Sequence, residues 1–351
     1  MFIVDAHEDI ASNVLRHGRD VRLPVSEIRR RERDRVPQPR NPRTGLSDTA
    51  MLGLPEHRRG GVGLVFATIF VPPGEQEAMT ADGWAQLRYY HELAAQADAG
   101  VRLVRTRGEL DGLLRDWHAT PTPDERPVGF TLLMEGADPL REPEDLEEWY
   151  REGLRLLGLA WRQTRYAGGT RAPGPLTGRG RALLAEMERL GVVLDTSHLA
   201  EESFWQALEL FSGTVIASHA NCRAFVPTDR QLSDDMIRAI AARDGVIGTV
   251  LANDFLVHGW TRDAPPVTLA DVVRHIDHIC QLTGSARHCG IGSDFDGGFG
   301  VESTPHELDS VADLGALAGA LAATGYSEDD VAGILGGNWL RLLERALPAG
   351  D

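Results

Sequence analysis

The sequence predicts an α/β fold, a closed (β/α)8 barrel of the TIM type, and three observations lead to this prediction. Short apolar segments alternate with longer segments of helical periodicity, which is the pattern of repeated β-α units and a parallel sheet. Eight strand-like segments can be identified, the number that a closed barrel needs. A chain of 351 residues is also of the usual size for such a barrel, so we expect one domain over residues 1–351.

The expected strands are the short apolar segments, and they occupy residues 2–5, 62–70, 128–134, 154–160, 192–196, 214–218, 245–252 and 289–293. The expected helices occupy residues 76–99, 143–152, 178–190, 201–211, 233–243, 268–283, 308–324 and 327–347. The segment 178–190 illustrates the pattern, because charged and apolar residues alternate up to Gly191, where a helix ends and a strand follows.

The charge balance excludes several classes of partner. Lys and Arg number 36 against 52 Asp and Glu, a formal net charge of −16, so the molecule would repel a phosphate backbone or an anionic membrane. We therefore expect no nucleic-acid partner. The basic run at 29–35 is interrupted by Glu32 and Asp34 and followed by a proline-rich stretch at 37–42. This favours a solvated loop, and contact with an acidic partner is the alternative.

The cysteines and the apolar segments favour a cytoplasmic protein without a membrane partner. Cys222, Cys280 and Cys289 are too few and too irregularly spaced for a disulfide framework, and they form no thiolate metal motif. Asp5 comes too early for a signal peptide, and no apolar run has the length of a membrane span. The oligomeric state cannot be read from this pattern, and a homodimer is left open.

Polar residues end five of the expected strands, at the edge where the active site of a (β/α)8 barrel lies. Five strand ends that all have residue types able to bind metal or transfer protons would be an unusual coincidence, so the pattern favours a functional site. They read Asp5-Ala6-His7-Glu8-Asp9, Met134-Glu135-Gly136, Asp195-Thr196-Ser197-His198, Ala217-Ser218-His219 and Ser293-Asp294-Phe295-Asp296-Gly297.

Two pairs of these side chains are candidate ligands for two cations. Extended backbone alternates sides, so His7 and Asp9 project to one face while the residue between them points away. His198 and His219 hold equivalent places on adjacent strands, and imidazole with carboxylate is a ligand set that suits zinc. Glu135 ends a strand from which its carboxylate could bridge two such ions.

Each of these residues also has a structural interpretation. A histidine at a strand end is often a capping or packing residue and binds no metal. Glu135 could form a hydrogen bond with the N-terminus of the next helix. We assign proton transfer or the binding of a substrate cation to Asp294, and a turn with the following glycines to Asp296. His288, just before the last strand, is a candidate for a group that supports a ligand. The remaining histidines are interpreted as surface or packing residues.

The ordered motifs resemble those of the membrane (renal) dipeptidase family of zinc peptidases. The resemblance covers almost the whole chain, and no single motif carries it. The residues that carry it are His7-Glu8-Asp9, Met134-Glu135-Gly136, Ser197-His198, Ser218-His219, residues 292–297, Gly60-Gly61-Val62-Gly63 and Asn338-Trp339-Leu340-Arg341.

This resemblance implies a barrel with a centre of two zinc ions. It places His7 and Asp9 on one ion and His198 and His219 on the other, with Glu135 bridging them and taking part in catalysis. It further implies that a metal-bridging hydroxide hydrolyses dipeptides, often with a D-residue at the C-terminal position. In this scheme Asp294 binds the free amino group of the substrate and assists proton transfer.

The resemblance also indicates residues that contact the substrate. Arg230 matches the place of an arginine that pairs with the substrate carboxylate, and such a pair can use two parallel hydrogen bonds. Arg223 is the competing candidate, and a surface role for Arg230 is the third interpretation. The renal type has a histidine after the fourth strand that contacts the reacting carbonyl, whereas this chain has Trp161 in that segment, as some bacterial relatives do. We expect Trp161 to contact the substrate.

Two other functions are compatible with the motifs. The first is a binuclear amidohydrolase that acts on an N-acyl amino acid, a lactone or another small amide, which would be favoured by turnover of substrates with a blocked amino group. The second is a metal-stabilised barrel that binds a ligand without catalysis. The complete ligand set together with Asp294 argues against the second.

Overall fold

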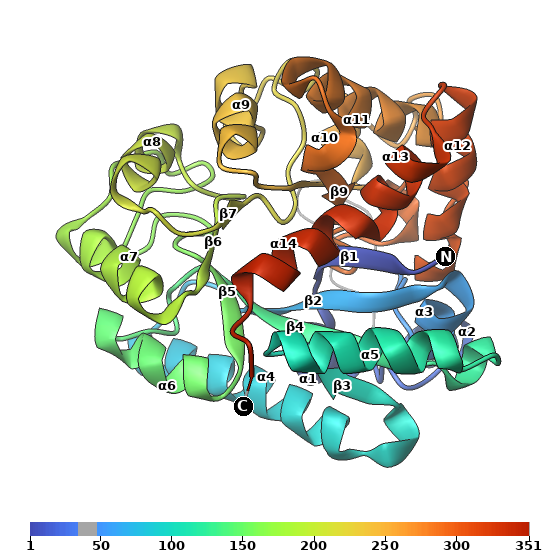
Figure 1. The fold of residues 1–351 in the computed structure, drawn as a ribbon, viewed down its shortest axis with the longest axis horizontal. Coiled ribbons are helices and arrows are strands. Elements are labelled where there is room, and N and C mark those ends of the chain that lie inside the picture. The colour runs from blue at the N-terminus through green and yellow to red at the C-terminus, as the bar shows by residue number, and fades with distance from the viewer. Residues whose placement is uncertain (34–47, 351) are drawn as a thin grey trace.

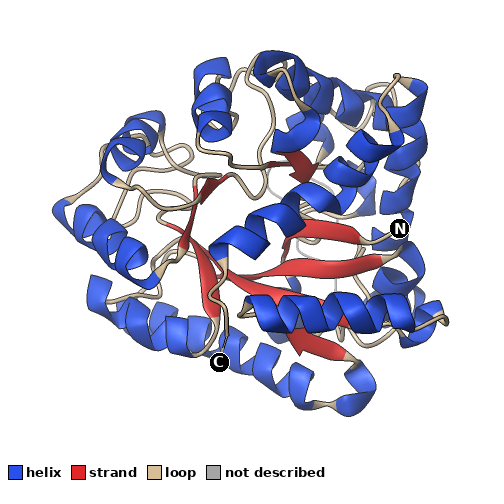
Figure 2. Ribbon diagram, in the orientation of Figure 1, coloured by secondary structure: helices blue, strands red, loops and turns tan. Residues whose placement is uncertain are grey.

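The computed structural model describes residues 1–33 and 48–350, and these form a parallel barrel surrounded by helices (Figure 1). Figure 2 shows the strands enclosed by the helical layer. The strands are β1 Ile3–Glu8, β2 Val62–Phe70, β3 Val101–Leu103, β4 Val128–Glu135, β5 Leu154–Gly158, β6 Val193–Asp195, β7 Val215–Ile216, β8 Ile247–Thr249 and β9 Cys289–Ile291.

Eight of these strands form the barrel. Their order is β7-β6-β5-β4-β2-β1-β9-β8, and all their pairings are parallel. A parallel bridge between Ala217 and Ile247 joins the two ends of this order and closes the barrel. The predicted fold class is therefore confirmed, and each of the eight expected strands is present. The additional strand β3 pairs with the first three residues of β4.

The helices cover the outside of the barrel. They are α1 Ile10–His17, α2 Val25–Arg33, α3 Leu54–Gly60, α4 Gln76–Ala95, α5 Arg107–Ala119, α6 Leu146–Arg151, α7 Gly178–Leu190, α8 Glu201–Leu210, α9 Asp234–Ala242, α10 Asn253–Leu256, α11 Leu269–Thr283, α12 Leu317–Ala323, α13 Glu328–Ala332 and α14 Asn338–Ala346. The helices that were not expected from the sequence are short or rich in charged residues, and they are α1, α2, α3, α5 and α10.

The expectation of a solvated loop at 29–35 is wrong for its described part. Residues 29–33 belong to α2, which buries Val25 and Ile28 on one face. The Arg29 guanidinium donates to the carbonyl of Ala50 at 2.8 Å and pairs with Asp309 at 2.8 Å, so the basic run helps to fasten α2 to the barrel. Residues 34–47, with Arg35 and the proline-rich stretch, lie outside the described residues.

The interior of the barrel is apolar at one end. Inward-facing residues of several strands, among them Leu64, Leu133 and Leu156, form one cluster with residues of α14. Trp339 of α14 is fully buried, and its indole N–H donates to the carbonyl of Ile291 at 3.0 Å. α14 therefore closes this end of the barrel, and the polar strand ends lie at the opposite, carboxyl end, where barrel enzymes place their chemistry. Among the described residues, no helix combines the length and apolar character needed to cross a membrane.

Candidate metal centre and active site

An irregularity in β1 determines which way the side chains of the motif His7-Glu8-Asp9 point. The register between β1 and β2 shifts between Asp5 and Glu8, so the regular alternation of the strand is broken there. His7 faces the barrel interior, where its ring stacks on that of His219 with centroids 3.6 Å apart. Glu8 points outward and its carboxylate lies 2.7 Å from His57 Nε2 of α3, with both side chains fully buried. The expected outward direction of Glu8 is confirmed.

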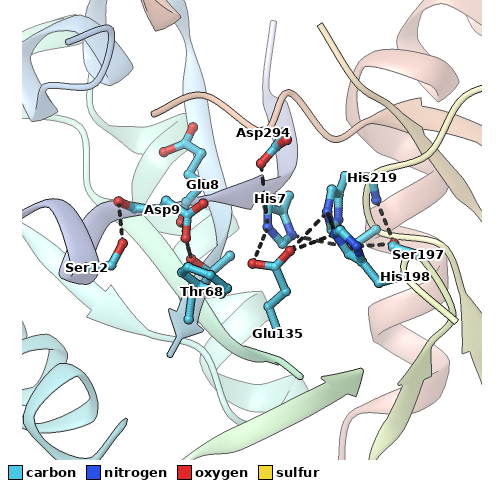
Figure 3. Close-up of polar contacts among 12 residues, drawn as sticks. His7, Glu8, Asp9, Ser12, Thr68, Glu135, Ser197, His198, His219 and Asp294 are labelled. Carbon is cyan, nitrogen blue, oxygen red and sulfur yellow. Dashed lines mark hydrogen bonds and ion pairs between the residues drawn. The ribbon is translucent and has the colours of Figure 1, made fainter. Parts of the chain in front are cut away.

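Glu135 stands between three imidazoles at the end of β4 (Figure 3). Its Oε1 atom lies 2.9 Å from His198 Nε2 and 3.3 Å from His219 Nε2. Its Oε2 atom lies on the other side, 3.6 Å from His7 Nε2. One carboxylate thus presents one oxygen to each of two groups of nitrogen ligands.

Asp9 and Asp294 complete the group on the His7 side. One ligand atom from each of these three residues lies within 4.8 Å of the others. Asp9 accepts a hydrogen bond from the Thr68 hydroxyl at 2.5 Å, which fixes the carboxylate on the inner side of β2. The Asp294 carboxylate is 3.9 Å from His7 Nε2. The residues predicted as ligands of one ion are therefore neighbours in the structure.

The electrostatics of the group fit divalent cations. Burial raises the pKa of Glu135 to about 8, against the lowering effect of Arg230, and burial together with the charge of Glu135 raises the pKa of Asp9 to about 6. Burial lowers the pKa of His219 well below its usual value, helped by the neighbouring His7, so this imidazole is neutral and has a lone pair to offer. His7 Nε2 is buried without a hydrogen-bond partner. These residues match the nitrogen and oxygen ligands of zinc.

The loop after β9 holds Asp294 in an unusual backbone conformation. Asp294 and Asp296 have φ values of 62° and 61°, in the left-handed region where residues other than glycine are uncommon and often functional. A Cβ atom on Gly297 would lie 2.0 Å from Asp294 Oδ1, so only glycine fits there. Asp296 accepts a hydrogen bond from the Met51 N–H at 2.9 Å, and Gly298 N donates back to its carbonyl at 2.9 Å, in keeping with the predicted turn.

Two pockets meet above this group. One, of about 320 Å³, is lined by Asp9, Glu135 and Asp294 among others. The other, of about 470 Å³, extends toward the loops after β5 and β7. Trp161 and Arg230 line both pockets, so they lie where the two join. The Trp161 ring is 6.3 Å from that of His198.

The structure distinguishes the two arginines that the sequence left open. Arg230 is buried in the cleft, and its guanidinium donates to the carbonyls of Ser197 and His219, each at 2.7 Å. Arg223 instead pairs with Glu201 at 2.5 Å and lines neither pocket. The backbone contacts of Arg230 hold its planar fork between the two histidine segments, which sequence reasoning did not anticipate.

Comparison with known proteins identifies the family. The profile of the membrane dipeptidase family, peptidase family M19, matches residues 1–349. The chain belongs to this family. A dipeptidase of Aspergillus oryzae is 27% identical over 313 residues, which is 82% of this chain and 68% of that relative. The predictions of family membership and of a metallo-dipeptidase type of hydrolase are thus confirmed.

Solved structures of M19 peptidases share the fold over the whole length. The metallo peptidase described as dipeptidase AC is 29% identical with a TM-score of 0.80, covering 100% of this chain and 99% of that one. A metallo peptidase from Rhodobacter sphaeroides, solved with a phosphinate mimic of the dipeptide L-Ala-D-Ala, is 28% identical with a TM-score of 0.80, covering 99% of both chains. The chain therefore shares the fold of these two metallo peptidases over 99–100% of its residues.

Several polar residues around this M19 site were not predicted. Ser218, Thr170 and Thr68 each place a hydroxyl on a candidate ligand, and Asp195 lies behind Ser218. The Ser-His pair that recurs at 197–198 and 218–219 was a usable sequence signal for Ser218. A threonine within a buried strand, such as Thr68, gives no such signal. The expectation that His288 supports a ligand is wrong, because it precedes β9 at the far end of the barrel and contacts the carbonyl of Gly245 at 2.9 Å.

Proposed function

We propose that this M19 chain is a two-zinc dipeptidase that cleaves the peptide bond of dipeptides, including those with a D-residue at the C-terminal position. The observation that carries the proposal is the placement of Glu135, with one carboxylate oxygen toward His198 and His219 and the other toward His7. A carboxylate in this position can be shared by two ions, one in each group of ligands.

In the proposed centre His7 and Asp9 hold one ion and His198 and His219 hold the other, with Glu135 common to both. Two zinc ions there would supply a hydroxide nucleophile at neutral pH and polarise the scissile carbonyl. The protein contributes the geometry, because every one of these side chains is oriented by a hydrogen bond, an ion pair or ring stacking.

Asp294 and Arg230 would bind the two charged ends of a dipeptide. Asp294 lies on the His7 side of the cleft, where it can accept hydrogen bonds from the substrate ammonium and carry a proton to the leaving amine. Arg230 lies where the two pockets join, and its guanidinium can pair with the terminal carboxylate. Two fixed charges of opposite sign in one short cleft favour a substrate of two residues. Trp161, which also lines both pockets, would contact this substrate.

The relative solved with a mimic of L-Ala-D-Ala supports a substrate with a D-residue at the second position. The amidohydrolase alternative differs in one requirement, since it does not need a free amino group opposite Asp294.

The decisive experiment is a substrate screen with zinc-loaded protein. We expect turnover of L-L and L-D dipeptides, and little or no turnover of their N-acetyl derivatives and of tripeptides. Preferred turnover of N-blocked substrates would replace the dipeptidase proposal by the amidohydrolase alternative. Zinc uptake without hydrolysis of any of these amides would contradict both.

A further inference from the structure

One buried hydroxyl contacts imidazoles from both halves of the proposed metal centre. Ser218 follows β7 and has no exposed surface. Its Oγ atom lies 3.2 Å from Nδ1 of His7 and 2.8 Å from Nδ1 of His219. The two rings are stacked, so they present these nitrogens to the same hydroxyl. Their other nitrogens, Nε2, face Glu135.

The hydrogen bonds of Asp195 decide which way the Ser218 proton points. Asp195 Oδ2 lies 2.6 Å from Ser218 Oγ, while Oδ1 accepts from the Ser197 hydroxyl at 2.6 Å and from the Ser218 N–H at 2.9 Å. A carboxylate that receives several donors acts as an acceptor only. The Ser218 hydroxyl therefore donates its single proton to Asp195 and keeps two lone pairs for other donors.

Each of the two lone pairs of Ser218 can accept a hydrogen bond from one of the two imidazoles. A neutral imidazole carries one N–H, and a hydrogen bond on one ring nitrogen determines which nitrogen remains free to bind a metal. With Nδ1–H of His7 and of His219 donating to Ser218, each ring keeps its Nε2 lone pair toward Glu135. Without the hydroxyl, either nitrogen of each ring could carry the proton.

The backbone around Ser218 leaves it little freedom to move. A Cβ atom on Gly248 would lie 1.9 Å from the Ser218 carbonyl oxygen, and one on Gly292 would lie 1.8 Å from it. Gly248 of β8 and Gly292, directly after β9, thus let the chain pass close to Ser218 where the barrel closes. The hydroxyl is held in place by the barrel itself.

We propose that Ser218 is a positioning residue that sets the tautomer of one imidazole in each metal site, so that the binding of both ions depends on a single hydroxyl. This inference rests on the proposed two-ion centre, with His7 in one site and His219 in the other. His198 offers an internal contrast, because its Nδ1 lies 2.9 Å from the hydroxyl of Thr170, which contacts neither of the other imidazoles.

The first test is zinc affinity, measured by titration against a competing chelator. Loss of a group that orients a metal-bound histidine commonly weakens metal binding ~10–100-fold. Ser218→Ala should weaken both ions by this factor, whereas Thr170→Val should weaken only one. Ser197→Ala is the matched control, because the Ser197 hydroxyl also donates to Asp195 and lies 3.2 Å from Ser218 Oγ but bonds to no imidazole ring. It should bind both zinc ions more tightly than Ser218→Ala does.

The second test is the tautomer itself, read from the ring-nitrogen chemical shifts of ¹⁵N-histidine-labelled, metal-free protein. Wild type should show His7 and His219 protonated at Nδ1, and Ser218→Ala should show mixed tautomers. Where Ser218→Ala does not fold, Asp195→Asn serves instead. Its amide can donate to Ser218, which turns the hydroxyl proton toward one ring and moves the proton of that ring to Nε2.

Wild-type affinity for two zinc ions in Ser218→Ala, or weakening of only one ion, would overturn the shared role. Unchanged Nδ1 protonation of both rings in Asp195→Asn would also overturn it. A wild-type protein that binds two zinc ions but hydrolyses no dipeptide would refute the proposed function and leave this inference standing.

Discussion

Replacing Asp294 with asparagine separates the chemistry of the carboxyl group from the shape of its loop. The two side chains are equal in size, which matters because Gly297 leaves no space beside Asp294. The variant should therefore keep the loop and both metal ions. If Asp294 transfers a proton in the reaction, kcat should fall about 10²–10⁴-fold. This corresponds to about 3–5 kcal/mol of activation free energy.

The same substitution should increase the stability of the metal-free protein in a pH-dependent way. Burial raises the pKa of Asp294 from 3.8 to about 8, with His7 acting in the opposite direction. Between these pH values the unfolded chain releases the proton while the folded protein retains it, so the wild type loses stability as pH rises. A difference of about four pKa units corresponds to on the order of 5 kcal/mol. The advantage of Asp294→Asn should grow from pH 4 to pH 8 and then level off.

Three measurements check this reasoning. They are kcat with a good dipeptide, zinc content by elemental analysis, and urea unfolding of chelator-treated protein at pH 5.5 and pH 8. Asp296→Asn is the control from the same loop, because Asp296 also has a left-handed backbone and a pKa raised by burial, to about 7, but pairs with Arg19. It should reduce kcat far less. Near-normal turnover of Asp294→Asn would give Asp294 a structural role and require another proton carrier. If the free energy of unfolding changed equally with pH in Asp294→Asn and in wild type, the buried Asp294 carboxyl group would not destabilise the metal-free protein as proposed.

Three further outcomes are expected. Elemental analysis should find about two zinc ions per chain, and Glu135→Ala should retain at most one; a maximum of one ion in wild type that survives this change would exclude the bridge. Arg230→Ala should reduce kcat/KM for a dipeptide roughly ten- to more than a hundredfold more than for its C-terminal amide, with Arg223→Ala as control; equal losses would refute the carboxylate contact. Gly297→Ala should lower kcat while zinc content stays constant. Gly319→Ala is the control and should leave kcat unchanged, because no atom lies within 4 Å of its added methyl group. Unchanged kcat in both variants would show that the loop at Gly297 tolerates the methyl group.

The strands were predictable because parallel barrel strands are buried on both sides. Each then reads as an apolar run, and Val62–Phe70 of β2 matches its expected range fully. β3 escaped prediction because it has only three residues, of which Arg102 is exposed. α5 was predictable in principle, since Thr106 and Glu109 form a capping box at its start, a local signal that the search for apolar periodicity overlooks.

The candidate ligands could be predicted because the barrel brings the carboxyl ends of its strands to one edge. Proximity in space follows from that rule even for His7 and His219, which are far apart in the sequence. The rule does not say which way a side chain turns at an irregular strand end, and β1 has such an irregularity beside His7. It also gives no information on hydroxyls such as that of Thr68, because threonine is common in strands for other reasons.

Charge balance gives a separate argument for two ions. Asp9, Glu135 and Asp294 are buried together, and burial raises the pKa of each carboxyl group. Arg230 contributes one positive charge near them, and Asp195 contributes one negative charge. A single Zn²⁺ would leave one negative charge of the three carboxylates uncompensated. Two ions would exceed the charge of the carboxylates by one, and the single negative charge of a hydroxide would complete the balance.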